Sequence, residues 1–72
     1  MYHVYAQTAS GDTPLLFSTA HSPVLRQLLG LHPEAERLIK REAREERNPC
    51  HVFFGRVHRV LGHSAFIVQW EE

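Results

Sequence analysis

The last third of the chain, residues 50–70, constrains the fold more than any other stretch. Apolar, β-branched and aromatic residues dominate it and fall into two runs, one on each side of Gly62-His63. Glycine reaches at little cost the positive φ angle that the first central position of a type II′ turn requires. We therefore predict two antiparallel strands joined by a two-residue turn, and this loop length fixes how the strands pair.

The predicted turn also assigns each residue to a face, because side chains alternate between the two faces of a strand. Trp70 is expected on the core side, over the bare backbone of Gly55. The other residues assigned to the core side are Phe53, Val57 and Val68. The opposite, uncovered side receives Phe54, Arg56, His58, Ile67 and Gln69. Apolar anchors beside cationic and titratable groups are typical of a protein contact surface.

Residues 2–19 predict a second hairpin. The first run alternates as a strand does and places Tyr5 on the uncovered side, while residues 10–14 have the glycine, aspartate and proline of a turn. Leu15–Thr19 is another short apolar run. Whether this run pairs as a strand stays open, because Pro14 fits only the start of a strand or an edge.

Two helical segments lie between the hairpins. Ser22, followed by proline, predicts a helix N-cap, and Gly30 predicts the end of that helix. Glu34 to Arg47 carries acidic residues in its first turn and a narrow apolar stripe, the strongest helix signal in the chain. Pro33 separates the two segments, so the region forms either two helices or one kinked helix.

The element order therefore predicts an α+β fold: one antiparallel sheet of about four strands in the order ββ-α(α)-ββ, with helix packed on one face. Seventy-two residues make a single domain, residues 1–72, with a small core. The other sheet face stays uncovered, and its apolar residues make it a candidate binding surface.

The balance of charge bears on the choice of partner. Eight basic and eight acidic residues cancel, which disfavours direct nucleic-acid binding because phosphate recognition needs clustered positive charge. Most of the charges lie in residues 34–47, in equal numbers of each sign. This helix either presents a solvated face or docks against acidic surfaces through Arg37, Arg41 and Arg44.

The single cysteine, Cys50, cannot form an internal disulfide, so a reducing cytoplasm is the expected setting. The chain does not open with a basic segment followed by an apolar one, and it has no apolar run of membrane-spanning length. We therefore expect neither export by that route nor membrane insertion. We also expect the chain to be a monomer or a small homo-oligomer.

Catalytic and metal chemistry find little support in the sequence. The six histidines do not follow the spacing of zinc ligands, and no cofactor motif is present. Cys50 and His51 are neighbours on a strand and point to opposite faces, so His51 is badly placed to activate the thiol. An RNA-cleaving site using Arg56 and His58 remains an alternative, with the histidine as general base and the arginine as phosphate clamp.

The layout resembles that of small bacteriophage-encoded inhibitors, namely anti-CRISPR proteins and phage proteins that bind host RNA polymerase. The resemblance is carried by Tyr2 to Thr8, Ser22 to Arg47 and Phe53 to Trp70, and it covers most of the chain. It implies a stoichiometric blocker of a large host nucleoprotein machine such as a CRISPR effector complex, acting without cofactor or turnover.

Two function classes follow. A non-enzymatic inhibitor or adaptor would bind a host protein or nucleoprotein complex through exposed anchors such as Tyr5, Phe54 and Ile67. A regulator that binds host RNA polymerase belongs to the same class. A nucleic-acid-binding or RNA-cleaving module would need clustered basic residues interleaved with exposed aromatic ones, and the neutral charge balance favours the first class.

Overall fold

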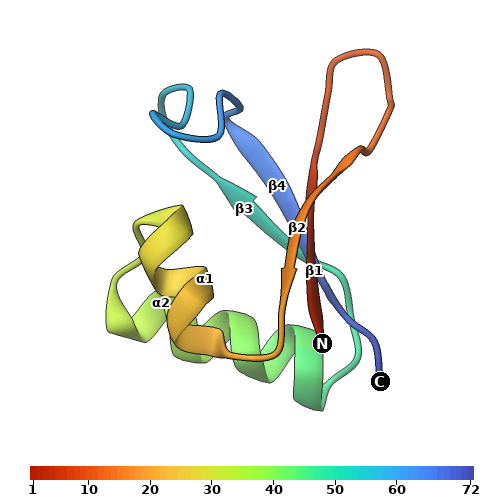
Figure 1. The fold of residues 1–72 in the computed structure, drawn as a ribbon, viewed down its shortest axis with the longest axis vertical. Helices are drawn as coiled ribbons and strands as arrows, with labels where there is room; N and C mark the ends of the chain where they lie inside the picture. The colour runs from red at the N-terminus through yellow and green to blue at the C-terminus, as the bar shows by residue number, and fades with distance from the viewer.

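A computed structural model describes all residues, 1–72, and shows a four-stranded antiparallel sheet with the helices on one face (Figure 1). The strand order across the sheet is β2-β1-β4-β3. The elements are β1 (Tyr2–Ala6), β2 (Leu15–Thr19), α1 (Ser22–Leu29), α2 (Pro33–Ile39), the π-helical η1 (Lys40–Glu45), β3 (Cys50–Phe53) and β4 (Ala65–Trp70). The predicted α+β class and ββ-α-α-ββ order are confirmed.

The amino-terminal hairpin forms, with β2 paired to β1 as a strand. Tyr2 lies opposite Thr19 and Val4 opposite Phe17, and a bulge after Val4 shifts the register so that Tyr5 meets Leu15. Proline is tolerated before Leu15 because β2 is an edge strand, which needs hydrogen bonds on one side only.

The helical region consists of two separate helices. Gly30 ends α1 in the left-handed conformation, with φ 64° and ψ 39°, and Pro33 opens α2. The Nδ1 atom of His32 caps α2 by accepting the Glu34 N–H. Ser22 is not the predicted N-cap: it is the first residue of α1, and its hydroxyl donates to the Glu36 carboxylate at 3.0 Å. Glu36, paired also with Arg26 at 3.4 Å, thus ties α2 to α1.

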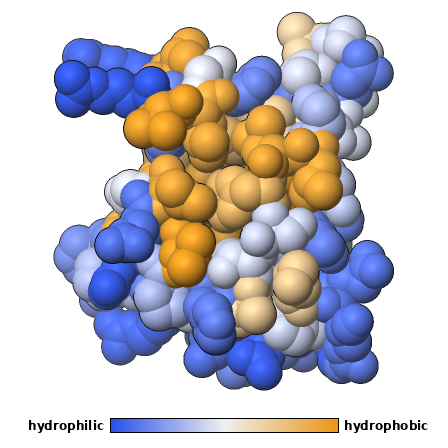
Figure 2. Space-filling model, in the orientation of Figure 1, coloured by the Kyte–Doolittle hydropathy of each residue, from blue (hydrophilic) through white to orange (hydrophobic).

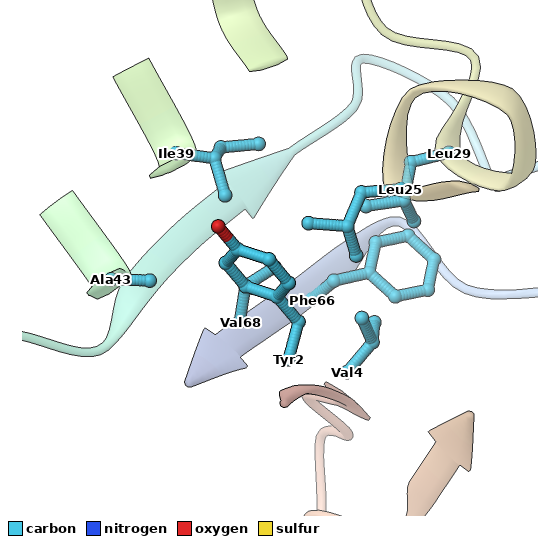
Figure 3. Packing of buried hydrophobic residues seen from close by; sticks show 8 residues of the cluster. All are labelled: Tyr2, Val4, Leu25, Leu29, Ile39, Ala43, Phe66 and Val68. Atoms are coloured by element: carbon cyan, nitrogen blue, oxygen red, sulfur yellow. The ribbon is translucent and has the colours of Figure 1, made fainter. Parts of the chain in front are cut away.

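The core lies between the helices and the inward face of the sheet (Figure 3). Its eight-residue cluster consists of Tyr2, Val4, Leu25, Leu29, Ile39, Ala43, Phe66 and Val68. The buried Tyr2 hydroxyl points toward Ile39 and Ala43 and has no hydrogen-bond partner. Burial raises the pKa of Tyr2, although the nearby Arg44 guanidinium opposes the shift. Only 9 of the 72 residues are buried, so little apolar surface stabilises the fold.

The pairing of the last two strands differs from the predicted register. The partners are Cys50 with Val68, Val52 with Phe66, and Phe53 with Ala65. A two-residue turn would have paired Val57 with Val68, so β3 has slid along β4. Phe66, Val68 and Trp70 still face the core, as predicted, because alternation within β4 is independent of its partner.

The physical reason for the shift is an eleven-residue connection, residues 54–64, in place of the predicted tight turn. The Nδ1 atom of His58 accepts the N–H groups of Val60 and Leu61 at 3.2 and 3.1 Å, and the Gly62 N–H donates to the His58 carbonyl oxygen at 2.9 Å. Gly62 has a positive φ of 74°, as expected, but it closes this helical-type turn. Because of this turn, residues 54–64 do not pair with β4 as a strand.

The slide exchanges the faces of two neighbouring phenylalanines. Phe53, predicted to face the core, is 70% exposed, whereas Phe54 is half-buried against Phe66 with ring centroids 5.4 Å apart. Trp70 does not cover Gly55, because a Cβ atom at Gly55 would have no atom within 4 Å. It packs against the Tyr2 ring instead, with a centroid distance of 4.8 Å.

No helix has the length and apolar character needed to cross a membrane.

Candidate protein-binding surfaces

The residues predicted for one contact face lie on different sides of the sheet. Tyr5, Ile67 and Gln69 are on the uncovered face, as expected. Phe54, Arg56 and His58 are not: they belong to the connection between β3 and β4. The predicted mixture of apolar anchors and cation on one face was therefore wrong, because it depended on the register of a two-residue turn.

The uncovered face, here called the open face, carries a row of residues that crosses all four strands. Tyr5 lies between Leu15 and Ile67, and Ile67 lies opposite His51. Leu15 is 54% exposed and the Tyr5 and Ile67 side chains are half-buried by their neighbours. Phe53 extends the apolar area on β3, where its ring is stacked on that of His51 at 6.2 Å.

No Asp, Glu, Lys or Arg side chain lies among the outward residues of the four strands. The polar residues beside the row are His3 and Ser18, which bond to each other through Nδ1 and Oγ at 2.6 Å, and Gln69. The nearest carboxylate is that of Glu71 at the margin, 3.9 Å from His3 Nε2. The open face therefore carries no formally charged strand residue, and the side chains of His3 and Ser18 are hydrogen-bonded to each other.

A second apolar surface lies on the opposite, helix-bearing side. The helices cover only part of the inward sheet face, and Figure 2 shows apolar side chains gathered between α1, β2 and the connection from β3 to β4. The exposed apolar residues here are Leu28 of α1 and Val57 and Val60 of the connection, at 38%, 66% and 76% exposure. Half-buried Leu16, Phe17 and Leu61 continue the surface into the core. We call this surface the loop patch.

Two cations accompany the loop patch. Arg56 and Arg59 are exposed on the same connection, which contains no acidic residue, and neither forms an ion pair. By contrast, Arg26 is paired with Glu36 and Arg47 with Glu72. The loop patch thus combines exposed aliphatic side chains with uncompensated positive charge.

The three candidate arginines of α2 and η1, which are Arg37, Arg41 and Arg44, do not form one cluster. Arg37 and Arg41 line a shallow groove of about 540 Å³ along the outer side of the helix, together with Glu34, Leu38, Lys40 and Glu45. Arg44 lies elsewhere, with its guanidinium 4.6 Å from the centre of the Trp70 ring. Three basic and two acidic side chains line the groove, so its charge is largely balanced, whereas the Arg44 guanidinium packs on the Trp70 ring by a cation–π contact.

His58 has a structural position. Its ring packs against Phe54 at 5.1 Å and Phe66 at 5.6 Å, and its Nδ1 atom already accepts two backbone N–H groups. In that arrangement the neutral ring carries its proton on Nε2, so no lone pair is free to take a proton from a substrate. This geometry gives the RNA-cleaving alternative no support.

The remaining chemical candidates are similarly placed. No group of three or more His, Cys, Asp or Glu side chains converges as metal ligands would. Cys50 is half-buried against the core, and burial raises the pKa of its thiol, which lowers its nucleophilicity at neutral pH. His51, its neighbour, is exposed on the open face, as the alternation predicts.

The sequence did not single out the residues of the loop patch. Leu28 falls within the helix predicted between Ser22 and Gly30, and Val57 and Val60 fall within the strand predicted before Gly62. The available signal was the run from Gly55 to Gly62, where two glycines and two arginines interrupt the apolar residues.

Comparison of the chain with protein-family models, curated proteins and solved structures finds no match.

Proposed function

We propose that this protein is a non-enzymatic binding module that acts by stoichiometric contact with another protein. The observation that carries the proposal is the loop patch, where Val57 and Val60 expose most of their side chains beside Arg56 and Arg59. Exposed aliphatic clusters of this kind are costly in water and mark interaction sites. The unpaired arginines favour a partner that presents an apolar anchor flanked by carboxylates.

A protein is a better partner than a nucleic acid for this surface. Single-stranded nucleic acids bind to exposed aromatic rings along a positively charged groove. The loop patch offers aliphatic side chains and two arginines, and the net charge of the chain is zero. The chemistry of the patch is therefore that of a hydrophobic anchor site with a cationic rim.

The finer prediction concerns the partner's identity. The resemblance in layout to phage-encoded inhibitors favours a host nucleoprotein machine in the bacterial cytoplasm, such as a CRISPR effector complex, with host RNA polymerase as the alternative. Identification of the protein captured from a bacterial lysate by mass spectrometry tests this choice.

The site itself is tested by matched variants. Val60→Asp and the double reversal Arg56→Glu with Arg59→Glu should each weaken the captured complex about thirtyfold or more, because a truncated or reversed anchor costs about 2 kcal/mol. The melting point should stay nearly unchanged, since these side chains are exposed. Leu38→Asp is the control, because Leu38 is 55% exposed on the helix groove. Loss of binding with Leu38→Asp and retention with Val60→Asp would place the contact on the helix and contradict the proposal.

A further inference from the structure

We propose that two copies of this chain associate through their open faces, packed sheet against sheet. The proposal concerns a different surface from the loop patch and does not depend on the function assigned to that patch. The core of a single copy is small, since 9 of 72 residues are buried, and domains of this size commonly gain stability by oligomerisation.

The neutrality of the open face favours a second copy as its occupant. A face that carries net charge repels itself, whereas the outward strand residues include no formally charged side chain. In a chain with sixteen Asp, Glu, Lys and Arg residues, the charges lie on the helices, loops and termini instead. The hydrogen bond between His3 and Ser18 also lowers the cost of removing their polar atoms from water.

The row across the sheet is self-complementary under two-fold symmetry. An axis parallel to the strands, between β1 and β4, places β1 over β4 of the second copy and β2 over its β3. Tyr5 then lies over Ile67 of the second copy, and Ile67 over Tyr5, because the two residues are directly paired within each sheet. Leu15 meets the stacked rings of His51 and Phe53 in the same way, which buries the exposed side chains at both edges.

The size of the face sets the expected strength. Four strands of about five residues measure roughly 15 Å by 17 Å. Two such faces cover roughly 500 Å² together in projection, less than the roughly 1,000 Å² of a stable specific interface, so we expect weak association with a dissociation constant in the upper micromolar range. The loop patch of each copy stays exposed, because it lies on the opposite side of the sheet.

Sedimentation equilibrium from roughly 1 to 300 μM protein tests the proposal, a range that reaches the upper micromolar concentrations at which the dimer is expected. Ile67→Arg should weaken dimerisation at least about a hundredfold, because it buries a charge against Tyr5 of the second copy and places two like charges on either side of the two-fold axis. Ile67→Val, which keeps an apolar side chain, and Val60→Arg on the loop patch should both still dimerise. Circular dichroism reports whether each variant is folded, and Leu15→Arg replaces Ile67→Arg if the latter does not fold.

A wild-type protein that is monomeric throughout this range would overturn the proposal. Dimerisation that survives both Ile67→Arg and Leu15→Arg would also overturn it and would point to pairing at the β3 edge. Loss of the dimer with Val60→Arg would show that the loop patch, and not the open face, joins the two copies.

Discussion

Two single substitutions, Phe53→Ala and Phe54→Ala, distinguish the observed register of β3 and β4 from the register that a two-residue turn would give. Phe54 makes edge-to-face contacts with Phe66 and His58 at 5.4 and 5.1 Å, while Phe53 is 70% exposed. We expect Phe54→Ala to destabilise the domain and Phe53→Ala to have little effect. The two-residue turn predicts the reverse order, because it directs Phe53 into the core.

The magnitude follows from the burial of the two rings. Truncation of a fully buried phenylalanine costs about 3 to 5 kcal/mol. Phe54 is half-buried, so about half of that applies, together with about 0.5 kcal/mol for the lost aromatic contacts, the lower end of the usual range because the ring is partly exposed. The expected cost is about 2 to 3 kcal/mol for Phe54→Ala and within about 0.5 kcal/mol for Phe53→Ala.

Thermal unfolding followed by circular dichroism measures the difference. In a domain of this size, about 2 to 3 kcal/mol lowers the melting point by roughly 10 to 20 °C. The scans are run at two protein concentrations, because Phe53 lies on the open face and dimerisation raises apparent stability by mass action. A larger loss for Phe53→Ala than for Phe54→Ala at both concentrations would refute the observed pairing of β3 with β4.

Three further changes have defined outcomes in the same unfolding assay. Gly62→Ala should cost about 1 to 2 kcal/mol because φ at Gly62 is 74°. Gly55→Ala should be nearly neutral because its Cβ atom would enter open space. Equal effects of the two substitutions would contradict the turn at His58. Arg44→Ala should cost about 0.5 to 1 kcal/mol through the lost contact with Trp70, and Arg41→Ala, exposed on the groove, should cost less. Stability should fall as the pH rises above about 10, because Tyr2 loses its proton more readily in the unfolded chain than in the folded one, where burial raises its pKa. Tyr2→Phe should reduce this loss of stability at alkaline pH. It should not destabilise the protein at neutral pH, because the Tyr2 hydroxyl has no hydrogen-bond partner. An equal loss of stability at alkaline pH in the variant would show that other groups cause it.

Local chemistry in the sequence determined much of this fold. The stop at Gly30 and the new start at Pro33 follow from backbone geometry that any surroundings would respect. Alternation along β1 and β4 placed Tyr5, Ile67 and Gln69 on the uncovered face, because successive side chains of a strand point to opposite sides whichever strand is its neighbour. These features predicted the element order, the fold class and part of the open face.

The tertiary structure decided the pairing of β3 and the character of the loop patch. In the connection at residues 54–64 the His58 ring packs against Phe54 and Phe66, and only the folded sheet brings Phe66 to this position. Val57 and Val60 are exposed because they lie in this connection and not in a strand of the sheet. Cys50 takes the place opposite Val68 that was predicted for Val57, and a change of register by an odd number of residues moves every side chain of a strand to the other face.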